Sequence, residues 1–104
     1  MLVESKADTE AKEQQGFTPL HNASEKGYLD IVQFLVESKV NIVAQTNDES
    51  TPLHIASGKG HLDVVQFLVE NEADIAAQTD DGSTPLHVAL NNGHYEIVQL
   101  LQYR

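Results

Sequence analysis

The sequence contains no cysteine among its 104 residues. Disulfide bonds, thiolate metal sites and a cysteine nucleophile are therefore excluded, and redox chemistry with them. A chain without cysteine suits the reducing interior of a cell. The first residues, Met1 to Glu4, lead into charged positions rather than into a basic stretch followed by an apolar one, so no targeting segment is visible. We expect an intracellular, cytoplasmic protein.

Basic residues are scarce as well. Six Lys and Arg stand against 16 Asp and Glu, which gives a formal net charge of −10. This charge opposes binding to nucleic-acid phosphates and to anionic membrane surfaces. Long apolar runs are also absent, and none approaches the roughly 20 residues of a membrane span. The sequence predicts no nucleic-acid or membrane partner and favours a protein partner that is basic or neutral.

Motifs that would indicate catalysis are missing too. The chain has no Gly-rich phosphate loop, no His-Glu-x-x-His pattern and no serine nucleophile motif. No pair of acidic residues recurs in a way that would mark a catalytic dyad. We therefore predict that the protein is not an enzyme and binds no cofactor.

What the sequence does contain is a repeat. The four residues Thr-Pro-Leu-His occur at positions 18–21, 51–54 and 84–87, at the same interval of 33 residues. A fixed interval of that size is typical of stacked-repeat proteins, in which each unit buries its apolar face against its neighbours. The core is then a continuous stripe rather than one globular centre.

Each unit predicts two helices, a turn between them and a hairpin-like connector. Thr is a good helix N-cap and Pro fits the first helical position, so a short helix begins at each Thr-Pro pair. A glycine, such as Gly60, permits the tight turn to a second helix. The connector, residues 38–50 or 71–83, holds a short apolar pair between Asn, Asp and Gly, which suits an extended arm that turns back.

The second helix has an apolar and a polar face. Leu62, Val65, Leu68 and Val69 fall on one side, whereas the polar residues at 63, 66 and 70 fall on another. We assign the first set to the core and the second to solvent. The repeated aromatic residues at positions 34 and 67 are assigned to the core by the same helical spacing.

The histidine of the repeated motif invites a metal hypothesis, which the spacing opposes. His21, His54 and His87 occupy one repeat position, so successive copies lie one unit apart and do not converge on one ion. We expect each to hydrogen-bond the Thr at its helix start and neighbouring loop backbone. His61 and His94 are interpreted as residues of the turn between helices, and no metal site is predicted.

These features together resemble the ankyrin repeat: Thr-Pro-Leu-His, Ala two residues later, Gly-His, a Val-rich second helix and Ala73-Asp74-Ile75. The resemblance covers essentially the whole chain and implies an all-α repeat solenoid of 33-residue helix-turn-helix units joined by hairpin-like loops. Residues 1–104 form one domain, divided into a partial leading repeat with its connector (1–17), repeats at 18–50 and 51–83, and a truncated repeat at 84–104. The chain is thus expected to begin inside a repeat.

Several residues depart from the family pattern. The glycine that usually ends the second helix is replaced by Lys39 and Glu72, which we expect to carry left-handed strain if they keep that conformation. Glu49 stands where Gly16 and Gly82 supply a hairpin glycine, so we expect the middle hairpin to have a different turn.

The resemblance also implies a protein-binding module whose contacts come from the hairpin tips and the inner surface of the first helices. Phe17, which is Ser in the other repeats, is either an exposed anchor for a partner or packs against the leading repeat. Carried over position by position, the expected contacts are Gln14, Gln15, Phe17, Glu25, Lys26, Asn47, Asp48, Ser50, Lys59, Asp80, Asp81, Ser83, Asn91 and Asn92. The expected framework residues are Thr18, Pro19, His21, Thr51, Pro52, His54, Thr84, Pro85 and His87.

Two functions remain open from the sequence. The first is a protein–protein interaction module for a partner with a basic segment, because the tips are acidic. The second is an engineered or truncated scaffold without a natural partner. In either case we expect a monomer or weak end-to-end self-association.

Overall fold

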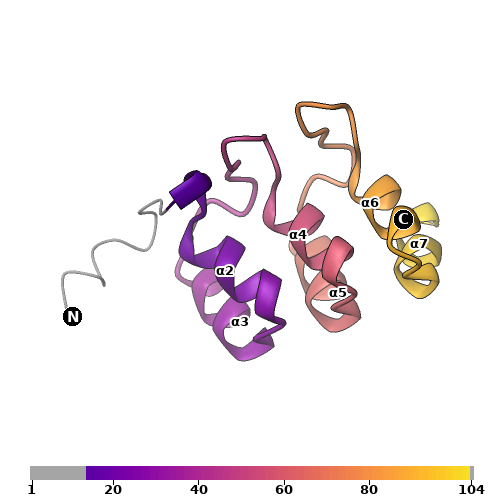
Figure 1. Ribbon diagram of the computed structural model, residues 1–104. Helices are drawn as coiled ribbons and strands as arrows, with labels where there is room; N and C mark the ends of the chain where they lie inside the picture. Colours follow the sequence, from indigo (N-terminus) through magenta and orange to yellow (C-terminus); the bar gives the residue numbers. More distant parts are fainter. Residues whose placement is uncertain (1–13, 104) are drawn as a thin grey trace.

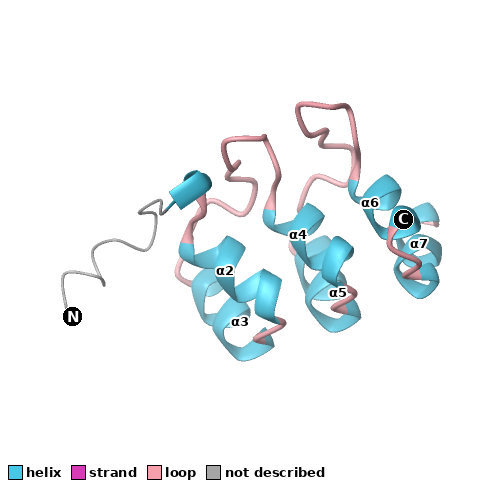
Figure 2. Cartoon of the chain, in the orientation of Figure 1, coloured by secondary structure: helices cyan, strands magenta, loops and turns pink. Residues whose placement is uncertain are grey.

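The computed structural model describes residues 14–103, and the regular secondary structure within them is helical, with no strand (Figure 2). Six α-helices follow one short 3-10 helix. In chain order the elements are η1 (Gln14–Gly16), α2 (Pro19–Lys26), α3 (Leu29–Glu37), α4 (Pro52–Lys59), α5 (Leu62–Glu70), α6 (Pro85–Asn91) and α7 (Tyr95–Gln102). The prediction of an all-α repeat solenoid is confirmed.

The helices form three pairs, which stand side by side in a row (Figure 1). The first helices form one layer, in which α4 packs between α2 and α6. The second helices form another layer, in which α5 packs between α3 and α7. The loops between pairs project to one side, beyond the ends of the first helices.

Each first helix begins where the repeated motif predicts. The Thr51 hydroxyl accepts from the backbone N–H of His54, and the Thr51 backbone N–H donates to His54 Nδ1 at 3.1 Å. This reciprocal pair satisfies two donors that a helix start would otherwise leave open. The same pair recurs at Thr18 with His21 and at Thr84 with His87.

The turns between paired helices require glycine at two positions. Gly27 and Gly60 have φ of 73° and 81°, in the left-handed region. A Cβ on Gly27 would lie 2.6 Å from His61 Nδ1, and one on Gly60 would lie 2.6 Å from the His94 ring. Glycine therefore serves the turn and also lets the histidine of the next pair approach.

The core lies between the two layers. Val65 and Leu68 are fully buried, Leu62 and Val69 are partly buried against the same cluster, and the polar residues 63, 66 and 70 are exposed, as the helical pattern predicts. The largest buried side chains come from all three pairs, among them Leu20, Leu53, Val64, Leu68 and Ile97. One stripe of apolar side chains therefore links the three pairs.

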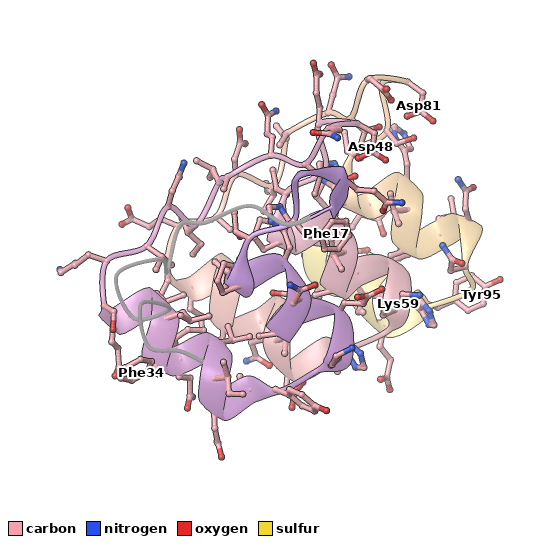
Figure 3. The ribbon with its side chains drawn as sticks, turned by 60° about the vertical axis from the view of Figure 1, so that its left-hand side comes forward. Phe17, Phe34, Asp48, Lys59, Asp81 and Tyr95 are labelled. Carbon is pink, nitrogen blue, oxygen red and sulfur yellow. The ribbon has the colours of Figure 1, made fainter. Side chains whose placement is uncertain are left out.

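The assignment of Phe34 to the core is wrong. Phe34 is 65% exposed, although Phe67 and Leu100, at the same repeat position, are partly buried against the core. The side chain at this position remains covered in the third pair, so we infer that it faces the preceding pair. Within residues 14–103 no second helix lies ahead of α3 in its layer, and Phe34 therefore projects from the end of the row (Figure 3).

The positions that lack the family's glycine keep its backbone conformation. Lys39 and Glu72 have φ of 71° and 72°, which is the left-handed region expected for them. Glu49 has φ of 68°, near the 85° of Gly82. The expected difference in the middle hairpin is wrong, because both hairpins close with the same bonds: Thr46 N–H to Ser50 C=O and Thr79 N–H to Ser83 C=O, each 2.9 Å.

Candidate protein-binding surface

Backbone hydrogen bonds join the loop tips to one another. The Asn47 N–H donates to the Gln15 carbonyl at 2.9 Å, and the Asp80 N–H donates to the Asp48 carbonyl at 3.0 Å. Each tip is thus tied to the tip of the preceding loop. The predicted contact residues from η1 and from the two connectors lie along one row as a result.

The tip carboxylates are held in place. Asp48 accepts a hydrogen bond from the Thr46 hydroxyl, and Asp81 accepts the equivalent bond from the Thr79 hydroxyl. These hydroxyl bonds are the main cause of a lowered pKa at both Asp48 and Asp81. Both side chains are exposed and negatively charged at neutral pH, and Figure 3 shows them on the projecting loops.

One cavity of about 300 Å³ lies at the first tip and is lined by Gln15, Phe17, Asn47 and Asp48. Phe17 is half-buried, and its ring centre lies 5.5 Å from that of His21 with a tilt of 51° between the planes. The cavity therefore brings an aromatic ring and a carboxylate to one place. Four of the predicted contact residues meet there.

A second cavity, of about 250 Å³, lies between the first helices. It joins the predicted contact residues Glu25, Ser50, Lys59 and Asn92 to four others, His54, Ile55, Gly58 and Val88. Ser50 comes from a loop, whereas the rest come from or adjoin α2, α4 and α6. The loops and the first helices therefore share one face, which we call the loop–helix face: η1, residues 47–50 and 80–83, and helices α2, α4 and α6.

The remaining predicted contacts lie in the elements that form this face. Lys26 and Asn91 are exposed at the last residues of α2 and α6, and Gln14 is the first residue of η1. Ser83 is half-buried, and its carbonyl accepts from His54 at 2.9 Å. Ser83 thus also contributes to the framework.

Sequence reasoning missed the apolar part of the face. Ile55 and Val88 are half-buried and line the second cavity, but neither is among the contact residues that the sequence predicts. The equivalent position in the first pair is Asn22. Variation between Asn, Ile and Val at one repeat position was the available signal that this site is not pure core.

The motif histidines have the structural role expected of them. His21 Nε2 donates to the Ser50 carbonyl at 3.0 Å and His54 Nε2 donates to the Ser83 carbonyl, each 29 residues along the chain. Among the contacts of residues 14–103, His87 accepts from the backbone N–H of its own Thr84 at 3.2 Å and is exposed. Within residues 14–103 no cluster of three or more His, Asp or Glu is arranged to hold a metal ion.

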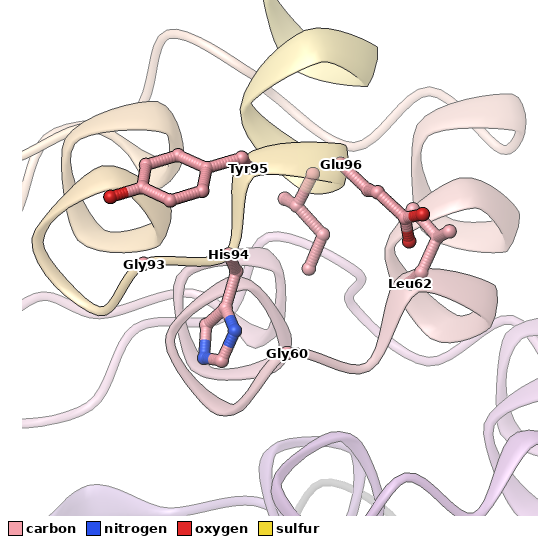
Figure 4. Close-up of a pocket in the computed structure, with 7 residues that line it drawn as sticks. Gly60, Leu62, Gly93, His94, Tyr95 and Glu96 are labelled. Atoms are coloured by element: carbon pink, nitrogen blue, oxygen red, sulfur yellow. The ribbon is translucent and has the colours of Figure 1, made fainter.

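The turn histidines lie where expected and also bridge neighbouring pairs. His61 Nε2 donates to the Glu25 carbonyl at 2.9 Å, and His94 Nε2 donates to the Gly58 carbonyl at 3.1 Å. His94 also lines a cavity of about 340 Å³ with Gly60, Leu62 and Tyr95 (Figure 4). Because Nε2 is already engaged with backbone, this histidine serves packing between turns.

Comparison with protein-family models gives two matches. A model described as ankyrin repeats (3 copies) matches residues 42–104, and one described as ankyrin repeats (many copies) matches residues 2–44. Comparison with curated proteins gave no match. None of the helices within the described part of the chain is long and apolar enough to span a membrane. The chain belongs to the ankyrin repeat family, whose members are generally protein–protein interaction modules and typically not enzymes.

Proposed function

We propose that this protein binds a partner protein through its loop–helix face. The observation that carries the proposal is the cavity shared by the loops and the first helices. There the half-buried apolar side chains of Ile55 and Val88 are surrounded by Glu25, Lys59 and Asn92. A small apolar centre ringed by polar groups is the arrangement in which a few partner side chains carry most of the binding energy.

The face is suited to recognition without rearrangement. Its tips are tied to one another by the Asn47–Gln15 and Asp80–Asp48 backbone bonds, and each first helix is fixed by its Thr–His cap. A surface that is ordered before binding avoids part of the entropy cost that a flexible loop incurs. We therefore expect the bound and free conformations of the face to be nearly the same.

The charge of the face favours a partner with a basic segment. Asp48, Glu49, Asp80 and Asp81 are exposed at two adjacent tips, in a chain of net charge −10. Such a field accelerates the encounter with a basic partner, and the effect weakens as salt screens it. Association with the partner should therefore be faster at low ionic strength.

Affinity capture from a cell extract tests the proposal. One bait is the unaltered chain, a second carries Asp48→Lys and Asp80→Lys at the tips, and a matched control carries Glu37→Lys and Glu70→Lys, which are exposed on the second helices. All three are first shown to have equal helix content and unfolding midpoints. We expect a protein retained by the first and third baits and lost by the second.

Two results would contradict the proposal. A partner lost from the control bait and retained by the tip variant would place recognition on the second helices. If the three baits capture the same proteins, the chain is better described as a scaffold without a partner of its own.

A further inference from the structure

The cavity at the first loop tip combines two groups that bind cations in different ways. Phe17, with its aromatic ring, and Asp48, with its carboxylate, both line a space of about 300 Å³, and Gln15 and Asn47 line it too. A ring attracts a cation through its negative face, and a carboxylate attracts it by charge and hydrogen bonding. The cavity is therefore lined by two residues whose side chains attract cations.

Both groups are positioned by the fold. The Thr46 hydroxyl donates to the Asp48 carboxylate, and this bond is the main cause that lowers the pKa of Asp48 below its ordinary value of 3.8. The carboxylate is ionised at neutral pH. The Phe17 ring packs at a tilt against His21, which is itself bonded to Thr18 and to the Ser50 carbonyl. Neither group has to be ordered when a ligand arrives.

We infer that this cavity receives an arginine side chain from a basic segment of the partner protein. The planar guanidinium stacks on an aromatic ring and also donates two parallel hydrogen bonds to a carboxylate, whereas a lysine ammonium is a compact point charge. The site offers a ring and a carboxylate together, which suits the planar guanidinium better than the ammonium. This inference rests on the proposed function and names the partner group that the first tip recognises.

The next tip provides an internal comparison. The positions 33 residues after Gln15, Phe17, Asn47 and Asp48 are Asp48, Ser50, Asp80 and Asp81. This second tip has more carboxylates and no aromatic ring. Arginine should therefore prefer the first tip, although simple charge attraction would favour the second.

Titration of the whole 15N-labelled chain with capped tripeptides tests the inference by NMR. The probes are acetyl-Gly-Arg-Gly-amide, its lysine analogue and its glutamine analogue. We expect the arginine peptide to shift the amide signals of Phe17, Asn47 and Asp48 at lower concentrations than those of Ser50, Asp80 and Asp81. The lysine peptide should bind several-fold more weakly at the first tip, and the glutamine peptide should give no saturable shift.

Two variants and two controls separate the contributions. Phe17→Leu keeps an apolar side chain and removes the ring, and Asp48→Asn removes the charge. Each should weaken the binding of the arginine peptide at the first tip by about three- to tenfold. Asp81→Asn removes a charge of the second tip and should leave binding at the first tip unchanged. Ser50→Phe adds the missing ring beside Asp81 and should create a second site for arginine.

The outcomes distinguish this inference from the proposed function. If the arginine and lysine peptides bind equally and Phe17→Leu has no effect, the tips attract cations only by charge; the inference fails while a basic partner remains possible. Equal binding of the two peptides with loss in Phe17→Leu would overturn the choice of arginine. Absence of binding by all three peptides would overturn the site, and the capture experiment would then test the face independently.

Discussion

His54 links two consecutive loops through opposite sides of its ring. Its Nδ1 accepts from the Thr51 backbone N–H at 3.1 Å, and its Nε2 donates to the Ser83 carbonyl at 2.9 Å. Only the neutral ring with its proton on Nε2 makes both bonds, because protonated Nδ1 cannot accept. The repeated histidine is thus a framework residue that joins one helix start to the next loop.

Protonation of His54 should therefore cost stability. Burial lowers the pKa of His54 below its ordinary value of 6.5, so the unfolded chain takes up this proton more readily than the folded one. The free energy of unfolding then decreases as the pH falls below 6.5. The pKa values of Asp48 and Asp81 are lowered from an ordinary value of 3.8. The stability that these two carboxylates contribute is therefore lost only below that pH.

We expect the thermal midpoint to decrease between pH 7.5 and pH 5.5 and the His54 ring signal to titrate below pH 6.5 in an NMR experiment. As a control, the histidine ring signals are recorded at pH 7.5 and at pH 5.5, below the unfolding temperature, to show that the protein is folded at both pH values. A His54 pKa at or above 6.5 in the folded protein would contradict this account of the loop link.

Glycine should stabilise the protein at the two left-handed residues that follow the second helices of the first and second pairs. Lys39 and Glu72 have φ of 71° and 72°, which costs a side chain about 1 kcal/mol relative to glycine. We expect Lys39→Gly and Glu72→Gly each to raise the free energy of unfolding by up to about 1 kcal/mol, because glycine's greater freedom in the unfolded chain offsets part of the gain. Denaturant unfolding measures the change.

A matched substitution at a helical residue should have the opposite sign. Glu70 lies in the last turn of α5, two residues before Glu72, and glycine in a helix costs about 1 kcal/mol. Glu70→Gly is therefore expected to destabilise. If Lys39→Gly and Glu72→Gly both lower the midpoint, strain at these positions is not the dominant effect.

A buried hydroxyl gives a second way to stabilise the chain. Ser57 on α4 is fully buried, and its hydroxyl has no hydrogen-bond partner among residues 14–103. An unsatisfied buried polar group costs about 1–3 kcal/mol, and alanine is also the better helix former. We expect Ser57→Ala to raise the free energy of unfolding by about 1 kcal/mol in denaturant unfolding. An equal or lower value would show that the hydroxyl is satisfied in solution.

The two repeated phenylalanines should respond differently to truncation. Phe67 packs against the core, whereas Phe34 is 65% exposed. We expect Phe67→Ala to cost about 2 kcal/mol and Phe34→Ala to cost within about 0.5 kcal/mol. Chemical denaturation of the two variants gives both values. Equal losses would show that Phe34 is covered in solution.

The sequence predicts the helices well because their starts depend on local residues. Thr51 and Pro52 mark the first residue of α4 correctly, since a cap and a fixed φ act within one turn. The left-handed backbone at Lys39 and Glu72 follows from the same repeat position. These features need no knowledge of the neighbouring pairs.

Features that depend on contacts with neighbouring helix pairs are harder to predict from the sequence. The exposure of Phe34 is set by which pair covers α3, and helical spacing carries no such information. The shape of the turn at Glu49 follows from the Thr46 and Ser50 bonds rather than from the lost glycine. The cavity beside Ile55 and Val88 exists only because three first helices and a loop meet there.

The central claim is that the loop–helix face recognises the partner. The most direct test is to map the binding of the captured protein, or a segment of it, onto the 15N-labelled chain by chemical-shift changes. The account predicts that the changed amides lie in residues 15–17, 47–50 and 80–83 and along α2, α4 and α6. Changes concentrated on α3, α5 and α7, with the loops unaffected, would contradict it.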